Sequence, residues 1–353
     1  MGRELNLNEL FREADAVLLT SEVSRRYYSG CDISEGMALL SPKGLVYMTD
    51  SRYIEAAERG MPGFRVIQIE RQHGYAYHMS EIIRGWNVET LGYEEESVTA
   101  GELRRLEDAL EVGFLPMQAE ISAARIVKTD RELDCVRTAQ EITDKTFSDI
   151  LNVITAGMTE KELKTELIYR LYKNGGEGLS FDPIVVSGPN TSMPHGVAGD
   201  RILCKGDFVT LDFGCKWGGY CSDMTRTVAL GCVTDEMQHV YETVLQAQEA
   251  GIAATKAGVA GRDVDAAARN VIERAGYGAY FGHGYGHGVG LEVHEAPNCS
   301  PSWDRPLPAG CVCSAEPGIY LPGKFGIRIE DLVIVAENTC ENITKSPKSL
   351  IIL

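Results

Sequence analysis

The fold is decided by two stretches of the chain, DFVTLDFGCKWGGYCSDMTRTVAL (residues 207–230) and CVCSAEPGIYLPGKFGIRIEDLVIV (residues 311–335). Each reads as two apolar strands joined by a glycine-containing turn, which predicts a β-hairpin. Each also follows two strongly periodic helical segments, and the Ala-Gly pair between those helices recurs at Gly157 and Gly258, 101 residues apart. The recurrence predicts an internal duplication, in which two similar halves build one domain.

Each hairpin carries a pair of carboxylates. The pairs are Asp212 with Asp223 in the first stretch and Glu316 with Glu330 in the second. A tight turn centred on Trp217 and Gly218 would set the first pair directly opposite each other on adjacent antiparallel strands. A three-residue turn at 322–324 would do the same for the second pair. The duplication therefore predicts that all four acids converge.

Burial makes this convergence chemically informative. Asp212 lies within the apolar run FVTLDF and Glu330 ends the run GIRIE, so both are expected to be buried. Buried carboxylates that repel one another are costly unless they are protonated or neutralised by cations. A carboxylate-rich site with one imidazole suits Mn, Co or Fe, with Zn as a further alternative. Two such ions would activate a water and stabilise a developing oxyanion, which fits hydrolysis of an unactivated acyl bond.

Three of the seven histidines, His283, His287 and His294, fall within twelve residues of one another. In GHGYGHGVG (residues 282–290) glycine occupies every second position. A strand here would have one bare face and one face carrying His283, Tyr285 and His287. His294 has the opposite parity, so it joins them only if the strand bends or breaks first. The stretch lacks the lysine and the helix start of a phosphate-binding loop, which argues against nucleotide binding.

The N-terminal third of the chain has a different pattern of apolar residues from the rest. Short apolar runs alternate with helical patterns up to about residue 125, and longer periodic helices begin near Arg131. We therefore predict an α+β protein with a small α/β domain at residues 1–125 and a second domain, with the internal repeat, at 126–353. A length of 353 residues is in keeping with two domains.

Charge and composition exclude several classes of protein. The chain has 34 Lys and Arg against 51 Asp and Glu, a formal charge of −17, which repels nucleic acids and anionic lipid surfaces. No apolar run approaches the roughly 20 residues that span a bilayer, and the acidic N-terminus lacks the pattern of a signal peptide. The ten cysteines form no C-x-x-C pair, so free thiols are expected. We expect a cytoplasmic protein with no nucleic-acid or membrane partner.

Several motifs together resemble the creatinase/prolidase/aminopeptidase P family in order and spacing. They are LDFG with its downstream Asp (211–223), GHGVGLEVHEAP (286–297) and EPGIYLPGKFGIRIEDLVIV (316–335). RRYYSGCDISEGMALLSPKGLVYMTDSRYIEAA (25–57) resembles the N-terminal domain of the aminopeptidase P and prolidase members. The resemblance extends over nearly the whole chain and implies a pita-bread fold for the second domain. Methionine aminopeptidases share the metal site but lack the N-terminal domain, so they fit less well.

The resemblance implies a role for each ligand. Asp212 would hold one metal ion, and Asp223 and Glu330 would bridge two. His287 and Glu316 would complete the ligands of the second ion. Glu316 would also move a proton between the attacking water and the leaving amine, which is general acid and base catalysis.

The remaining histidines of the motifs are implied to act on the substrate. His294 would donate a hydrogen bond to the oxyanion. His195, in SMPHG, and His283 would contact the substrate carbonyl and the proline side. Tyr285 departs from the small or aliphatic residue expected between its two glycines, which bears on the shape of the substrate pocket.

Two residues near Glu330 are further candidates for the substrate-binding site. Arg328 shares a strand face with Glu330 and is expected to orient it. Tyr320, in EPGIY, is a candidate for contact with substrate. Asp331 lies on the opposite strand face, so Asp331→Asn is expected to leave the metal site intact.

The function implied by the resemblance is hydrolysis of peptides with proline in the second position. The protein would be an Xaa-Pro aminopeptidase or an Xaa-Pro dipeptidase, with two divalent ions, Mn first among them, and would form a homodimer. Two alternatives are a creatinase-like C–N hydrolase, which dispenses with metal, and a non-catalytic binding module of the same fold. All five ligand types are present, which disfavours both alternatives.

Overall fold

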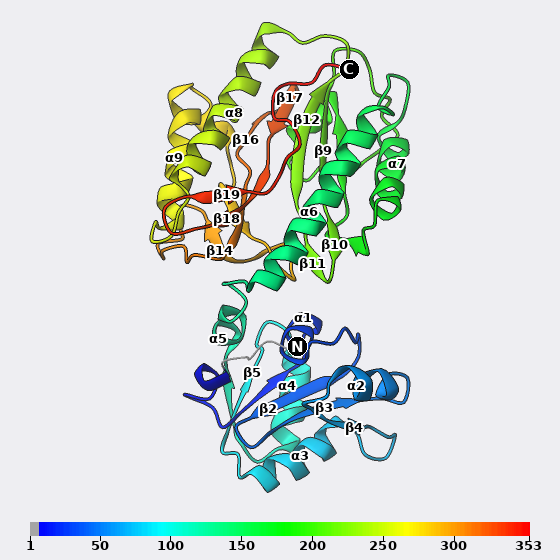
Figure 1. Cartoon of the computed structure of the whole chain (residues 1–353), viewed down its shortest axis with the longest axis vertical. Coiled ribbons are helices and arrows are strands. Elements are labelled where there is room, and N and C mark those ends of the chain that lie inside the picture. The colour runs from blue at the N-terminus through cyan, green and yellow to red at the C-terminus, as the bar shows by residue number, and fades with distance from the viewer. Residues whose placement is uncertain (1–6) are drawn as a thin grey trace. The chain divides into compact units, whose positions relative to one another are not determined.

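A computed structural model describes residues 7–353 and shows two compact units, one that ends at Arg125 and one that begins at Ile126 (Figure 1). Both units combine helices and sheets, as the sequence predicts. Within residues 7–353, no helix combines the length and the apolar character that crossing a membrane requires.

The first unit is built on a six-stranded mixed sheet. Its strands are β1 (Ala16–Leu19), β2 (Met37–Ser41), β3 (Gly44–Thr49), β4 (Arg65–Gln68), β5 (Thr90–Tyr93) and β6 (Gly113–Pro116). Its helices are α1 (Glu22–Ser29), α2 (Ile54–Gly60), α3 (Tyr75–Trp86), α4 (Ala100–Ala109) and α5 (Gln118–Ala123). The strand order is β4-β3-β2-β1-β5-β6. Along β1, Val17 and Leu19 enter one core cluster while Ala16 and Leu18 enter another, because successive side chains of a strand point to opposite faces.

The helices of the second unit repeat the order of a longer and a shorter helix. They are α6 (Asp130–Leu151), α7 (Glu160–Lys173), α8 (Asp235–Ala254) and α9 (Gly261–Arg274). Thr129 and Thr159 start α6 and α7 with complete capping boxes, and Thr234 caps α8 by accepting from a backbone N–H. The two helix pairs pack into separate core clusters, on opposite sides of the strands (Figure 1).

The strands of the second unit lie between the helix pairs. They are β7 (Gly178–Leu179), β8 (Ile184–Ser187), β9 (Phe208–Phe213), β10 (Cys215–Trp217), β11 (Tyr220–Cys221), β12 (Met224–Ala229), β13 (Gly286–Gly288), β14 (Glu295–Cys299), β15 (Val312–Ala315), β16 (Gly318–Leu321), β17 (Phe325–Arg328), β18 (Asp331–Val335) and β19 (Cys340–Asn342). They form sheets of order β11-β10-β7, β12-β9-β8, β14-β13-β15-β18-β19 and β16-β17. Short 3₁₀ helices lie at Leu7–Glu9, Gly188–Ser192 and Gly278–Tyr280.

The register of the first carboxylate hairpin differs from the prediction. The turn is formed by Gly218 and Gly219, whose φ angles are 57° and 87°. Positive φ at both central residues is what the favoured two-residue hairpin turn requires, and glycine adopts it without steric cost. Asp212 therefore pairs with Thr225 and not with Asp223. Because the shift is two residues, the pattern of faces along the strand is preserved.

The second carboxylate hairpin has the predicted register. Leu321 pairs with Phe325 around a three-residue turn, and Gly318 pairs with Arg328. Continuing this register by two residues brings Glu316 and Glu330 to opposite positions just beyond the hairpin.

Candidate active site

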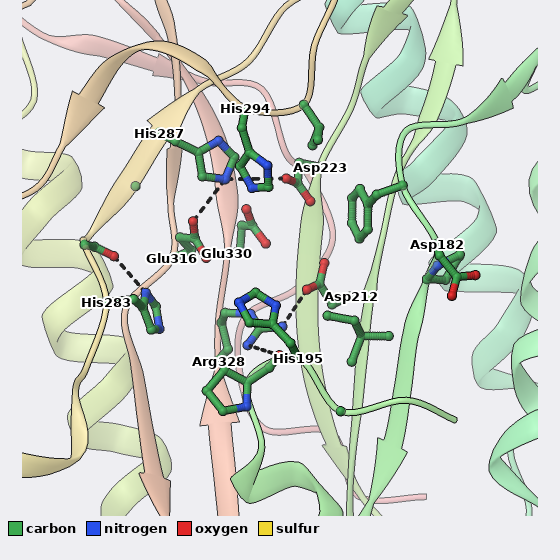
Figure 2. Close-up of a pocket in the computed structure, with 18 of the residues that line it drawn as sticks. Asp182, His195, Asp212, Asp223, His283, His287, His294, Glu316, Arg328 and Glu330 are labelled. Carbon is green, nitrogen blue, oxygen red and sulfur yellow. Dashed lines mark hydrogen bonds and ion pairs between the residues drawn. The ribbon is translucent and has the colours of Figure 1, made fainter. Parts of the chain in front are cut away.

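A cavity of about 560 Å³ in the second unit is lined by all the candidate site residues except Tyr320 (Figure 2). The candidate metal ligands come from well-separated elements. Asp212 lies on β9, Asp223 precedes β12, His287 lies on β13, Glu316 follows β15 and Glu330 lies between β17 and β18. The duplicated hairpins thus deliver acids from both halves of the domain to one place, as the sequence predicts.

Three of the four acids are deeply buried. The relative exposure is 8% for Asp212, 4% for Asp223 and 2% for Glu330. One oxygen of each carboxylate, Oδ1 of the two aspartates and Oε1 of Glu330, has no hydrogen-bond partner among the described residues. Burial raises the pKa of all three carboxyls above the ordinary value, and the nearby charge of Glu316 raises it further.

The unpartnered oxygens fit a divalent cation. Asp223, His287 and Glu330 each present a ligand atom, and these atoms lie within 4.8 Å of one another. Buried polar atoms without a partner are rare, and each calls for an explanation such as an ion or a water. Carboxylate oxygens with one imidazole nitrogen form a donor set suited to Mn, Fe, Co or Zn. The residues therefore fit the metal centre that the sequence predicts.

His287 directs one ring nitrogen at the acids. Its Nε2 lies 3.1 Å from Glu316 Oε1 and 3.8 Å from Asp223 Oδ2, while Nδ1 lies 3.2 Å from the carbonyl oxygen of Gly288. A bond from Nδ1 to a backbone carbonyl fixes the tautomer of a ligating histidine. Burial opposes the charged ring, but the hydrogen bond and charge of Glu316 prevail and raise the pKa of His287 to about 9. Burial likewise opposes the charge of Glu316, yet His287 lowers the pKa of this carboxyl to about 2.

Arg328 binds Asp212 directly and reaches Glu330 only through Thr225, so the contact to Glu330 that the sequence suggests is indirect. Its Nη2 donates to Asp212 Oδ2 over 2.5 Å, and its Nε donates to Thr225 Oγ1 over 2.9 Å. Thr225 Oγ1 in turn donates to Glu330 Oε2 over 2.7 Å. Thr225 was missed in the sequence, although it follows Asp223 by two positions and so has the strand parity of a site residue.

Tyr320 lies behind the cavity, where it links Arg328 to His283. Arg328 Nη1 donates to the Tyr320 hydroxyl over 2.8 Å, and that hydroxyl lies 2.9 Å from His283 Nε2. His283 Nδ1 is 2.8 Å from the carbonyl oxygen of Gly284. Burial lowers the pKa of His283, so the neutral ring donates from Nδ1 and accepts at Nε2. His283 therefore offers its ring, and not a free N–H group, to the cavity.

His294 reaches the cavity because the preceding strand breaks. β13 ends at Gly288, the chain turns, and β14 begins at Glu295. The rings of His287 and His294 then lie edge to face with centroids 4.2 Å apart. Burial, together with the charge of His287, lowers the pKa of His294. His195 also lines the cavity and is exposed (Figure 2).

Tyr285 does not share the cavity face with His283 and His287, contrary to the prediction. Its side chain is fully buried in the core beneath α8, and its hydroxyl donates to the carbonyl oxygen of Gln248 over 2.8 Å. The paired strand β13 is only three residues long, so the strict alternation assumed for a longer strand does not extend back to Tyr285. Tyr285 is therefore not a lining residue of the cavity.

A buried ion pair supports the segment that carries His294. Lys128 Nζ lies 2.7 Å from Glu295 Oε1, and both side chains are almost completely buried. The lysine also donates to the carbonyl oxygen of Ile126. The two partners are 167 residues apart, so no local pattern in the sequence could have identified the pair.

A second buried network lies behind Glu330 and includes Asp331. Arg226 Nη2 binds Asp331 Oδ1 over 2.7 Å, and Arg226 Nη1 donates to the backbone oxygen of Glu330 over 2.6 Å. Lys348 Nζ lies 3.0 Å from the other oxygen of Asp331. Removing one partner of a buried ion pair costs about 3–5 kcal/mol of folding stability. Asp331→Asn is therefore unsuitable as a harmless control, because it breaks a network that touches Glu330.

Comparisons with known proteins give consistent matches. Two family models match: the creatinase/prolidase N-terminal domain at residues 9–127 and metallopeptidase family M24 at residues 134–337. A solved Xaa-Pro dipeptidase from Bacillus anthracis is 41% identical, with a TM-score of 0.93 and coverage of 96% of this chain and 95% of that chain. An X-Pro aminopeptidase from Thermotoga maritima is 38% identical, with a TM-score of 0.90 and coverage of 96% and 98%. An Xaa-Pro dipeptidase from Pyrococcus furiosus is 33% identical over 96% of this chain and 95% of its own length. These matches confirm the expected fold class, with a pita-bread second domain.

Proposed function

Because the chain belongs to metallopeptidase family M24, we propose that it hydrolyses the peptide bond between an N-terminal residue and proline with the help of two divalent ions. Residues 126–353 would form the catalytic domain and residues 1–125 the N-terminal domain. The observation that carries the proposal is a set of three buried carboxylates, each with an unpartnered oxygen; two of them, Asp223 and Glu330, present ligand atoms within 4.8 Å of one another and of a ring nitrogen of His287. This set favours a metal-dependent peptidase over a metal-free hydrolase or a non-catalytic module.

The metal centre would be held by the acids and the imidazole described above. Asp212 would ligate one ion, Asp223 and Glu330 would bridge both, and His287 with Glu316 would complete the second. When bound, two divalent ions lower the pKa of water and stabilise developing negative charge. The oxygen-rich ligand set makes Mn the proposed ion, with Co, Fe or Zn as alternatives.

The remaining chemistry falls to the side chains. Glu316 would take a proton from the attacking water and deliver it to the proline nitrogen as the C–N bond breaks. His294 would donate a hydrogen bond to the carbonyl oxygen as negative charge develops there. His195, at the exposed part of the cavity, would contact the substrate carbonyl, and His283 would pack its neutral ring against proline.

Arg328 and Tyr320 would support this arrangement without leaving their own contacts. Arg328 holds Asp212 directly and Glu330 through Thr225, so it fixes two proposed ligands at once. Tyr320 helps to orient His283, whose tautomer is set by the carbonyl oxygen of Gly284. Such supporting contacts typically change metal affinity or activity about 10- to 100-fold when they are lost.

Location and assembly are proposed as well. The ten cysteines are free thiols, which is typical of a reducing compartment and supports a cytoplasmic protein. The homodimer is proposed from the family resemblance.

Proline specificity tests the proposed function directly. Proline fixes φ and removes the N–H that ordinary peptidases grip, so a site shaped to its rigid ring loses little entropy on binding. We expect Ala-Pro-Ala to be cleaved and Ala-Ala-Ala to have a kcat/KM at least about tenfold lower, the lower limit for one methylene missing from an apolar pocket. Acetylating the N-terminus of Ala-Pro-Ala should also strongly lower kcat/KM, because the α-ammonium that would face Asp212 is removed.

These rates are measured with Mn-loaded enzyme by quantifying released alanine. Equal kcat/KM for Ala-Pro-Ala and Ala-Ala-Ala would contradict the proline assignment while leaving a general metallopeptidase. Equal rates before and after acetylation would contradict recognition of the free amine.

A further inference from the structure

The cavity is poor in available cations. Among the described residues that line it, Arg328 is the only lysine or arginine. Each of its three side-chain nitrogens already donates to the protein. Nε bonds Thr225, Nη1 bonds Tyr320 and the backbone oxygen of Pro194, and Nη2 bonds Asp212. Arg328 is also buried, so it has no free face for a second anionic partner.

The outer part of the cavity offers no further cation. Asp182, which lines the cavity apart from the other acids (Figure 2), is bound to Lys164 Nζ over 2.6 Å. The remaining nitrogen groups that can carry a positive charge are histidines. His287 already faces Glu316 and Asp223 and is a proposed metal ligand. His283 has both ring nitrogens engaged, and His195 and His294 are already assigned to the substrate carbonyl.

A dipeptide would bring a carboxylate into this environment. In Xaa-Pro the free carboxylate is attached to the same carbon as the scissile nitrogen, so it must enter the cavity with the reacting bond. A carboxylate removed from water without a cation or several donors is strongly disfavoured. In a longer peptide the same position is a neutral amide, which needs only one donor to its oxygen and one acceptor for its N–H.

Asn298 is placed to meet such an amide. On β14 the neighbouring Cys299 packs into the core, so Asn298 has the opposite parity and lines the cavity. Its side-chain amide makes no hydrogen bond to any residue from 7 to 353, whereas Ser300 nearby is engaged with Ser302. An amide side chain both donates and accepts, which suits a peptide group and not a carboxylate alone.

We propose that the protein is an aminopeptidase for peptides of three or more residues, and that free Xaa-Pro dipeptides are poor substrates. The proposal rests on the proposed Xaa-Pro activity and names its substrate class. It distinguishes between the two enzyme types found among the similar structures, a dipeptidase and an aminopeptidase.

The test compares Ala-Pro with Ala-Pro amide, which differ only in the charge of the C-terminal group, and with Ala-Pro-Ala. We expect kcat/KM for Ala-Pro to be at least about tenfold below that for Ala-Pro amide. A charge that enters a site without a partner costs more free energy than the amount that corresponds to a tenfold change in kcat/KM. Ala-Pro-Ala should be cleaved at least as well as the amide. Equal or faster cleavage of Ala-Pro would overturn the aminopeptidase inference and leave the Xaa-Pro activity standing. Failure to cleave all three would instead contradict the proposed function.

A charge introduced at Asn298 provides an independent check. Asn298→Lys places an ammonium in the cavity, and Asn298→Met is a neutral control of similar length. The ratio of kcat/KM for Ala-Pro to that for Ala-Pro amide should rise about tenfold or more in the lysine variant, and by clearly less in the methionine variant, which loses the contact to the amide but adds no charge. Because both substrates are measured on one preparation, partial loss of folded protein cancels in the ratio. An unchanged ratio in the lysine variant would count against the inference, and where either variant is inactive the wild-type ratio decides.

Discussion

Asp223→Asn should abolish both metal occupancy and peptidase activity. Asp223 is the proposed bridge between the two ions, it is deeply buried, and its Oδ1 has no hydrogen-bond partner within residues 7–353. Replacing the carboxylate with an amide removes a negative charge and one acceptor oxygen from the proposed metal site. We expect metal affinity to fall by more than the roughly 10- to 100-fold that is typical for loss of an outer partner. Bound metal is measured by elemental analysis after Mn loading, and activity is measured on Ala-Pro-Ala.

The same substitution at Asp200 is the matched control. The Asp200 side chain is 84% exposed and pairs with exposed Lys161, and such surface pairs contribute little to stability. Asp200→Asn should retain metal and activity. The folded state of Asp223→Asn is checked by its melting temperature without metal, which should not fall, because one of several repelling buried carboxylates is gone. Wild-type metal content and activity in Asp223→Asn would refute the bridging role.

His294→Ala should separate catalysis from metal binding. The side chain lines the cavity beside His287, and burial keeps its ring neutral. A neutral imidazole N–H stabilises negative charge that develops on the substrate carbonyl without holding an ion itself. Loss of one oxyanion donor typically lowers kcat by about 10²- to 10³-fold, so we expect a fall of that size while metal content stays at the wild-type level.

His239→Ala provides the corresponding control, because His239 is exposed on α8 and is not a residue of the cavity. It should leave kcat and metal content unchanged. Parallel loss of metal and activity in His294→Ala would show that His294 is a ligand or a structural residue, and would contradict its assignment as a donor to the carbonyl oxygen.

The sequence predicted the convergence of the acids because short-range geometry governs it. The Pro-Gly-Lys turn set the register of β16 and β17, and the apolar runs around Asp212 and Glu330 indicated their burial. The strand pairing predicted for the first hairpin was two residues out of register, because the sequence alone allows a tight turn at either Trp217-Gly218 or Gly218-Gly219. The φ angles of the two glycines decide between them.

The contacts that support the site could not be predicted from the sequence. Lys128 meets Glu295 and Arg226 meets Asp331 only through the tertiary fold. The strand parity that placed Glu330 on the cavity face failed for Tyr285, because β13 is too short for alternation to extend that far. Arg328 was recognised as a site residue, but its direct partner is Asp212 on β9, and it reaches Glu330 only through Thr225.

The most direct test of the account is a titration of metal-free protein with Mn, in which bound metal, melting temperature and Ala-Pro-Ala hydrolysis are followed together. We predict an inactive metal-free protein, and activity that rises with bound Mn up to about two ions per chain, as expected of a two-ion centre. The melting temperature should rise in parallel, since a ligand at 100 times its Kd stabilises the folded state by about 2.7 kcal/mol. Full hydrolysis of Ala-Pro-Ala by protein with almost no bound metal would contradict the account.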